Sequence, residues 1–242
     1  MGNYRLMAFS TGERLAREDV LFVDGEPAAR RQICVLSWCL RGPTTIVVDS
    51  GLRYSPLPGN EEKFDQDGAS LVERLATIGV EADDVEFLLL THLHHDHCEN
   101  VAAFPNATVV TSARGWQWLD HAESFEERAF PRALLREHFS SNEGALRLVE
   151  NGEEVVPGIT TVQTAGHTPC SQMYLVQTRD GIMAFTGDEL MLGESWRLRR
   201  RVGLSMNPLG SEAALSVACD LCSGIFPSHD PAALTVDTTL RF

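Results

Sequence analysis

A dense cluster of imidazole and carboxylate side chains directly follows an apolar run at residues 85–90. Four of the eight histidines fall within six positions, in the segment Thr91-His92-Leu93-His94-His95-Asp96-His97. In an extended segment, residues i and i+2 point to the same side, so His92 and His94 can bind one cation together. If the chain turns into a helix near Asp96, then Asp96 and His97 can face a second cation nearby. Imidazole nitrogen and carboxylate oxygen are ligands that zinc accepts.

Three later fragments each place a potential ligand just beyond an expected strand. They are Gly166-His167-Thr168, Thr186-Gly187-Asp188 and Ser228-His229-Asp230. A single His or Asp at such a place is usually a turn or cap residue, and the first cluster alone could be a solvated turn. Four fragments at strand ends, where functional groups commonly collect, instead predict a metal centre.

The predicted centre is suited to hydrolysis. A bound zinc ion lowers the pKa of its water from about 16 to about 7, and two ions about 3.5–4 Å apart can share a hydroxide while one polarises a carbonyl. An ester, lactone, thioester or amide could be cleaved without a serine or cysteine nucleophile. Cys98 and Cys170 adjoin the expected ligands in sequence, and we interpret them as packing or supporting residues.

The ordered set His92-x-His94-x-Asp96-His97, His167, Asp188, His229 resembles the ligand set of the metallo-β-lactamase superfamily. The resemblance runs from Asp49-Ser50-Gly51 to the His229 loop. It implies an α/β fold, the αβ/βα four-layer sandwich, with two Zn²⁺ ions at one edge and Fe, Mn or Co as alternative metals. It assigns the ligands as follows: His92, His94 and His167 to the first ion, Asp96, His97 and His229 to the second, and Asp188 to both. Asp96 and Asp188 are the expected catalytic residues.

Several short sequence segments are similar to those of the quorum-quenching N-acyl-homoserine lactonases within that superfamily. They are residues 91–100, Phe104-Pro105-Asn106-Ala107, Gly166-His167-Thr168-Pro169 and Ser228-His229-Asp230. We therefore expect an enzyme that opens a lactone or related ester through a metal-bridging hydroxide. Met191 stands where well-known members of that branch carry a Tyr near the substrate carbonyl. Either a metal polarises the carbonyl alone, or the substrate is not an acyl-homoserine lactone.

Three alternatives stay open on the sequence. Glyoxalase II-type thioesterases share the word Phe185-Thr186-Gly187-Asp188 but usually carry a further helical domain. Persulfide dioxygenases of the same fold use one iron held by part of the ligand set. A non-catalytic metal-binding module is disfavoured, because nothing in the sequence removes a ligand. Flavin-partnered diiron reductases carry Glu at the position of His94, and the familiar zinc β-lactamases carry Cys at that of Asp188.

The elements that position these residues follow from the hydrophobic pattern. We expect strands at residues 32–40, 44–49, 85–90, 158–163, 173–176 and 182–186, with Arg41-Gly42-Pro43 as a hairpin turn. A helix capped by Asp67 should carry Leu71, Leu75 and Ile78 and stop at Gly79. Another should span residues 211–222 and stop at Gly224. The aromatic segment 112–140, broken by Pro131, is expected to be helical and to form one wall of the substrate pocket through Trp116 or Trp118.

Composition narrows the class of protein further. A chain of 242 residues with a formal net charge of −14 fits one domain over residues 1–242 that does not bind nucleic acid. No signal segment or membrane-length apolar run is apparent, which favours a cytoplasmic protein acting on a small-molecule lactone or ester. A homodimer is an open alternative. The basic cluster at 197–201 is either a solvated face or an anion site, and Cys219 and Cys222 are expected to be ordinary helix residues.

Overall fold

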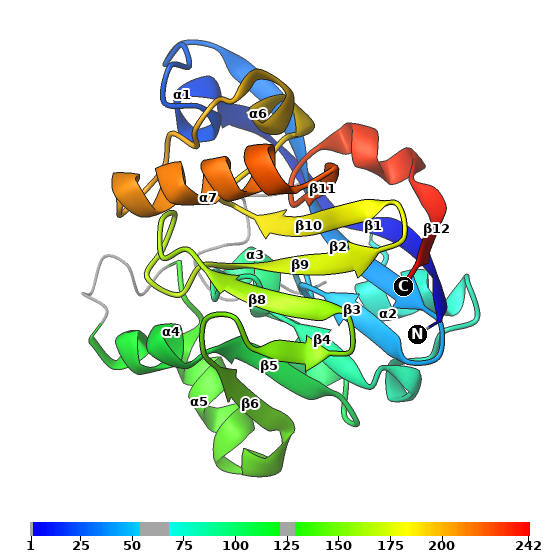
Figure 1. The fold of residues 1–242 in the computed structure, drawn as a ribbon. Helices are drawn as coiled ribbons and strands as arrows, with labels where there is room; N and C mark the ends of the chain where they lie inside the picture. Colours follow the sequence, from blue (N-terminus) through cyan, green and yellow to red (C-terminus); the bar gives the residue numbers. More distant parts are fainter. Residues whose placement is uncertain (1, 54–67, 122–128) are drawn as a thin grey trace.

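Two β-sheets lie face to face in the computed structural model, which describes residues 2–53, 68–121 and 129–242 (Figure 1). The first sheet contains, in spatial order, β12 (Asp237–Arg241), β1 (Asn3–Arg17), β2 (Arg30–Arg41), β3 (Thr45–Val48), β4 (Phe87–Leu89), β5 (Thr108–Ser112) and β6 (Leu146–Val149). The second contains β11 (Gly224–Pro227), β10 (Gly181–Gly187), β9 (Gln172–Thr178), β8 (Ile159–Gln163) and β7 (Glu154–Val156).

Helices cover the outer face of each sheet. The α-helices are α1 (Glu18–Leu21), α2 (Leu71–Ala76), α3 (His95–Cys98), α4 (Ala113–Trp118), α5 (Arg132–Ser140), α6 (Gly193–Leu198) and α7 (Pro208–Leu221). Short 3₁₀ turns are η1 (Ala82–Asp84), η2 (Val101–Ala103), η3 (Leu119–His121), η5 (Glu143–Ala145) and η6 (Pro231–Thr235). Apolar residues of α2, α4 and α5 pack on the first sheet, and those of α7 pack on the second. The predicted four-layer sandwich is therefore confirmed.

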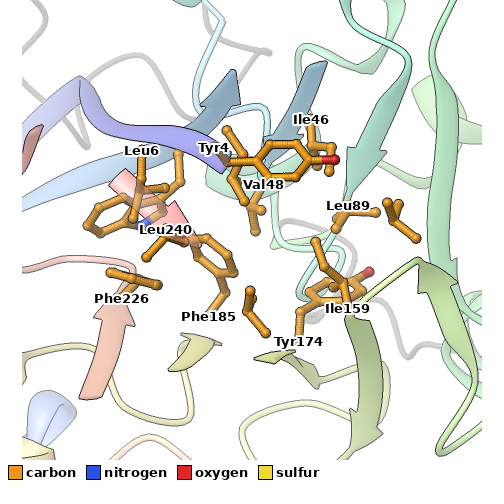
Figure 2. Packing of buried hydrophobic residues seen from close by; sticks show 14 of the residues in the cluster. Tyr4, Leu6, Ile46, Val48, Leu89, Ile159, Tyr174, Phe185, Phe226 and Leu240 are labelled. Carbon is orange, nitrogen blue, oxygen red and sulfur yellow. The ribbon is translucent and has the colours of Figure 1, made fainter. Parts of the chain in front are cut away.

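The central core lies between the two sheets. Figure 2 shows side chains from both sheets pointing toward one another, with Ile46 and Leu89 from the first facing Ile159 and Phe185 from the second. Each of these side chains is at most 1% exposed. Complete burial of such a side chain stabilises the fold by about 1.5–3 kcal/mol, so this layer holds the two sheets together.

A hydrogen-bonded tyrosine also joins the sheets near one end of the core. The hydroxyl of Tyr174, on β9, lies 2.9 Å from the carbonyl oxygen of Leu90 and 3.2 Å from that of Val110, and it accepts from Gln172 Nε2 at 2.7 Å. Leu90 and Val110 belong to the first sheet's side of the sandwich. Burial raises the pKa of Tyr174 well above its usual value, so the hydroxyl keeps its proton.

The strand directions place the ends of several strands at one edge of the sandwich. Strands β3, β4, β5 and β6 pair in parallel, as do β10 and β11. Loops that follow parallel neighbours leave the sheet at the same edge. The residues after β4, β10 and β11 therefore emerge close together, and these are the segments that carry the candidate ligands.

Some expected elements differ from those observed. Helix α7 begins at Pro208 rather than at 211, because proline is suited to the first helical turn. It ends at Leu221 in front of an extended Cys222, so Gly224 starts β11 and is not the helix stop. Strands β5, β6, β7 and β12 and the 15-residue strand β1 were not individually predicted.

The helix boundaries near residues 70 and 130 also differ in detail. Asp67 lies outside the described residues, and Ser70 caps α2 through a capping box with Glu73. In the described part of the segment 112–140, α4 and α5 are separate helices, and Pro131 occupies the cap position of α5. Among the described residues, no helix has the length and apolar composition to span a bilayer. One domain over 1–242 stays a prediction.

Candidate metal centre

Four segments of the chain converge at one edge of the sandwich. His92 and His94 follow β4, and the chain then turns into α3, which carries Asp96 and His97, as the sequence predicted. The turn between β8 and β9 supplies His167. The other two residues come just after strands: Asp188 directly follows β10, and His229 follows β11 with Ser228 between them. The structure therefore brings all seven predicted site residues together.

Three histidines gather around one oxygen of Asp188. His94 Nδ1 lies 3.0 Å from His92 Nε2 and 3.1 Å from His167 Nε2. Asp188 Oδ2 lies 3.3 Å from His167 Nε2 and 3.8 Å from His92 Nε2. All four donor atoms fall within 4.8 Å of one another, a spacing that one metal ion can bridge.

A second group of donors gathers around the other oxygen of the same carboxylate. Asp188 Oδ1 lies 3.2 Å from His97 Nε2 and 3.0 Å from His229 Nε2. Each of these nitrogens is 3.9 Å from an oxygen of Asp96. The two oxygens of Asp188 thus face two different donor groups, and this grouping coincides with the pairings that the resemblance implies.

Hydrogen bonds on the far side of the rings orient the imidazoles. The partners of the outward nitrogens are Asp49 Oδ2 for His97 at 2.8 Å, the Leu204 carbonyl for His167 at 2.7 Å, and the Cys34 carbonyl for His229 at 2.8 Å. Carboxylate and carbonyl oxygens only accept, so each Nδ1 carries a proton, and in the neutral form of each ring Nε2 directs a lone pair inward. Such partners fix ring orientation in metal sites.

The inward lone pairs are the observation that tests whether metal ions fit. Nitrogen lone pairs and two carboxylates face one another in a buried space, which is unfavourable unless a cation lies between them. Nε2 of His97 is buried and has no hydrogen-bond partner among the described residues. The donor set of imidazoles and carboxylates matches zinc or another divalent transition metal.

The electrostatics keep most of these groups in metal-binding form. Burial, reinforced by the neighbouring histidines, lowers the pKa of His92 and of His94 well below the usual value, so both stay neutral. Burial opposes ionisation of Asp96 and Asp188, but nearby histidines outweigh it and lower both pKa values. His97 is the exception, since three carboxylates overcome its burial and raise its pKa. A metal must therefore displace a proton from His97.

Two supporting residues were not recognised from the sequence. Asp49, at the end of β3, accepts from the backbone and hydroxyl of Thr91 as well as from His97. Its backbone has φ of 59°, which is strained for a non-glycine residue. Ser228 donates to Asp188 Oδ1 at 2.7 Å. The sequence did contain a signal for Asp49, because it is an acidic residue at the end of β3, the strand that pairs in parallel with β4.

The two cysteines beside the ligands are supporting residues. Cys170 Sγ accepts from the backbone of Leu93 at 3.4 Å, and Cys98 Sγ donates to the Leu93 carbonyl at 3.4 Å. Both thiols are buried, and burial raises the pKa of Cys170 to about 11 and that of Cys98 well above its usual value. Neither is ionised near neutral pH, which agrees with the packing role expected from the sequence.

A cavity of about 140 Å³ opens beside the centre. Its described lining includes candidate ligands together with Arg14, Val20, Ile33, Ala129, Met191 and Leu204. The Met191 carbonyl accepts from the backbone of His229 at 2.9 Å, and its thioether side chain brings no hydrogen-bond donor to this wall.

The aromatic wall predicted for this cavity is largely elsewhere. Trp116 lines a separate groove, where it packs on Phe139 and beneath the guanidinium of Arg136. Trp118 packs on Phe130, whose ring centre is 4.5 Å from that of His94. Of the described aromatics in this segment, Phe130 is therefore the one in contact with a candidate ligand. Phe125 lies outside the described residues.

The basic cluster at 197–201 is engaged in local ion pairs. Arg200 pairs with Glu194 and Asp24, and its guanidinium carbon lies 3.7 Å from the ring centre of Phe22. Arg199 pairs with Asp220 at 2.8 Å. Because Arg199 and Arg200 are already paired with carboxylates, these contacts disfavour an anion site. Arg200 is not part of a solvated face either, since its side chain is only 17% exposed.

Comparison with known proteins assigns the fold family. Residues 37–225 match the family model described as the Metallo-beta-lactamase superfamily. The chain belongs to this superfamily. Among curated metallo-β-lactamase relatives, it is 28% identical to an N-acyl homoserine lactonase from a Bacillus species, over 58% of each chain. It is also 28% identical to an N-acyl homoserine lactonase from Bacillus cereus, over 62% of each. The chain thus spans less than two thirds of these relatives' lengths.

Solved structures agree with the superfamily assignment. The chain is similar to a quorum-quenching N-acyl homoserine lactone hydrolase, with a TM-score of 0.78 and 20% identity over 97% of this chain and 96% of that one. A second N-acyl homoserine lactone hydrolase, with N-hexanoyl-L-homoserine bound at its catalytic metal centre, gives a TM-score of 0.77 and 20% identity over 96% and 95%. Likeness at this identity shows the shared metallo-β-lactamase fold.

Proposed function

We propose that this protein is a dinuclear zinc hydrolase that opens a lactone or a related ester, with N-acyl-homoserine lactones as the first candidates. The observation that carries the proposal is the position of Asp188, whose two oxygens each face a separate group of inward-directed donors. The curated relatives named as N-acyl homoserine lactonases support the choice of substrate class.

The seven proposed ligands divide the work as the geometry suggests. His92, His94 and His167 would hold one ion, Asp96, His97 and His229 would hold the other, and Asp188 has an oxygen near each group. When bound, the ions activate water for attack and polarise the carbonyl. Zinc fits because every donor is an imidazole nitrogen or a carboxylate oxygen.

The protein groups around the ions position the reactants. Ser228 holds Asp188 in one orientation, so the bridging carboxylate is fixed before substrate enters. Asp96 lines the cavity, and its carboxylate is placed to take a proton and return it to the leaving alcohol. The apolar wall of Val20, Ile33 and Leu204 accepts the hydrocarbon part of the substrate.

Met191 has a mechanistic consequence within this proposal. The side chain cannot donate a hydrogen bond to the substrate carbonyl, so polarisation falls to the metal. A site that relied on one such donor would lose about 3–4 kcal/mol of transition-state stabilisation without it. We therefore expect slower turnover than a site with a hydroxyl there, or a more reactive ester as substrate.

The broader setting is proposed from the sequence. We propose a cytoplasmic protein with one domain over residues 1–242 that does not bind membranes. Its formal net charge of −14 disfavours binding to nucleic acid, which is also negatively charged. A homodimer is compatible with this proposal, and light scattering of the purified protein would decide it.

The test begins with metal content and activity on matched substrates. We expect about two zinc ions per chain, hydrolysis of N-acyl-homoserine lactones, and loss of activity on chelation that zinc restores. Asp188→Ala should lose both metal and turnover, because it removes the only carboxylate shared by both donor groups among the described residues.

The same panel separates the alternatives. Greater activity on S-lactoylglutathione would indicate a thioesterase. One iron per chain with oxygen uptake would indicate a persulfide dioxygenase. Full activity after exhaustive chelation would contradict all of these proposed functions, because each of them depends on metal.

A further inference from the structure

A second carboxylate directly follows the proposed bridging ligand in the chain and makes its hydrogen bonds outside the candidate ligand side chains. Glu189 is 1% exposed and is not among the candidate ligands. Its Oε1 accepts from Thr164 Oγ1 at 2.6 Å and from the backbone nitrogens of Gly166 and His167, both at 3.0 Å. Its Oε2 accepts from Ser211 Oγ at 2.9 Å. One buried carboxylate thus binds four donors, three of them in the turn that presents His167.

The turn that Glu189 holds is conformationally demanding. Ala165 has φ of 47°, in the left-handed region that non-glycine residues avoid. A Cβ at Gly166 would lie 2.6 Å from Glu189 Oε2 and 2.4 Å from the backbone nitrogen of Ser211. The turn is therefore pressed against Glu189 and α7. Charge-assisted hydrogen bonds from its backbone offset the cost of this shape.

The opposite side of the turn is held by the segment before α7. Met206 N donates to the His167 carbonyl at 3.2 Å, and Asn207 N donates to the Gly166 carbonyl at 2.9 Å. The His167 ring itself donates to the Leu204 carbonyl. The bond to Leu204 sets the rotation of the ring. The carboxylate of Glu189, together with the two backbone bonds, holds the backbone from which the ring extends.

We infer that Glu189 is a positioning residue that fixes His167 relative to Asp188 and so sets the affinity of the first metal position. Adjacent residues at the end of β10 send one carboxylate to the metal centre and the other to the turn that carries a ligand for that centre. The inference rests on the proposed metal centre but not on the lactone substrate. Through His167, Glu189 acts on the donor group that also contains His92 and His94, whereas its hydrogen bonds reach none of Asp96, His97 and His229.

Metal titration tests this directly. Metal-free protein is titrated with Zn²⁺ against a chromophoric chelator, and separately with Co²⁺ while the visible absorption spectrum is recorded. We expect Glu189→Ala to weaken one of two tight sites by about 10–100-fold and to leave the other unchanged, as for removal of other groups that orient ligands. Its Co²⁺ spectrum should resemble that of His167→Ala, in which the first position lacks a ligand.

Double substitution separates positioning from a general loss of stability. In the His167→Ala background, adding Glu189→Ala should not lower metal affinity further, because the residue that it positions is absent. Glu212→Ala is the matched control, since Glu212 is an exposed carboxylate on α7 whose side chain is 62% exposed. It should leave both affinities unchanged.

The isosteric variant keeps the test decisive if Glu189→Ala does not fold. Glu189→Gln retains the shape but loses the charge, so a smaller weakening of the same single site is expected. The inference would be overturned by any of three results. These are wild-type affinity at both sites in Glu189→Gln, equal weakening of both sites, or an additive effect with His167→Ala. If the wild type has two tight sites, any of these results would leave the proposed function intact. If the wild type has no tight site, both the inference and the proposed function are wrong.

Discussion

The metal centre depends on how individual side chains are restrained from behind. Imidazoles that donate to Asp49, to the Leu204 carbonyl and to the Cys34 carbonyl have only one orientation in which these bonds form. The donors are therefore arranged before any ion arrives. Such preorganisation lowers the entropic cost of ordering the ligands when metal binds. Removing a single atom that orients a ligand should therefore lower metal affinity measurably.

Ser228→Ala tests this at the smallest scale. Removing the hydroxyl that donates to Asp188 Oδ1 frees the proposed bridging carboxylate to rotate, so zinc affinity should fall by about 10–100-fold. Chelator competition and kcat report the loss, and Ser228→Thr should largely restore both. Ser37→Ala is a suitable control, because this buried hydroxyl has no hydrogen-bond partner among the described residues. Equal affinity in Ser228→Ala and wild type would show that Asp188 needs no such restraint.

Residue types predicted much of the centre, but not what supports it. The segment from His92 to His97 and the three later fragments were recognised because four such fragments at strand ends, taken together, indicate a metal centre. Glu189 gave no such signal, since a glutamate after Asp188 is indistinguishable from a surface residue until the His167 turn is seen to fold against it. Hydrogen-bond partners 22 or more residues apart are set by tertiary structure.

At the scale of elements, the short helices depend on their caps. Helix α2 spans only Leu71–Ala76 and begins with a reciprocal capping box between Ser70 and Glu73. Isolated helices of this length are unstable in water, so capping and the burial of Leu71 and Leu75 must maintain it. The helix packs on the outer face of the first sheet.

Ser70→Ala should therefore lower stability without altering the metal centre. Loss of the cap costs about 0.5–2 kcal/mol, which lowers the Tm by roughly 2–4 °C for each 1 kcal/mol in a chain of this size. Chemical denaturation of the zinc-loaded protein measures the change, and zinc content should be unaffected. Ser70→Asp should recover most of the loss. A change in metal affinity would mean that α2 also influences the metal centre.

Element boundaries were predicted less well than element types. The buried strand before His92 and the strands before Asp188 were recognised from their apolar runs. Strand β6 was not, because Leu146-Arg147-Leu148-Val149 is short and contains an arginine that reaches the Val155 carbonyl across the sandwich. The start of α7 was misplaced because Pro208 reads equally well as a helix breaker or a first-turn residue.

At the scale of the whole molecule, the two sheets are joined both by apolar packing and by buried polar contacts. Tyr174 is the clearest of these contacts, because its hydroxyl lies near carbonyl oxygens of Leu90 and Val110 while its ring belongs to the core. Leu90 precedes the His92 loop by one residue. The contact therefore couples the alignment of the sheets to the start of the metal-binding segment.

Tyr174→Phe should destabilise the whole fold. The substitution keeps the ring but removes the hydroxyl that donates to a carbonyl and accepts from Gln172 Nε2. The Leu90 carbonyl still accepts from Gln172 Nε2, and the Val110 carbonyl still accepts from the Leu90 backbone, so the expected cost is that of a hydrogen bond, about 0.5–1.5 kcal/mol. Urea denaturation of metal-free and zinc-loaded protein measures it, and Tyr4→Phe provides a control on the other side of the same core. If both variants unfold at the wild-type midpoint, the hydroxyl of Tyr174 does not contribute to holding the sheets together.

The two donor groups draw on both sheets, and this has a consequence for how the protein is made. The first group combines residues after β4 with His167 and Asp188 from the second sheet, and the second group requires His229 after β11. A growing chain on the ribosome presents the His92 segment long before His229 has been synthesised. Early-emerging histidines can then hold an ion only loosely, so full metal loading must wait until the C-terminal strands have been translated and docked.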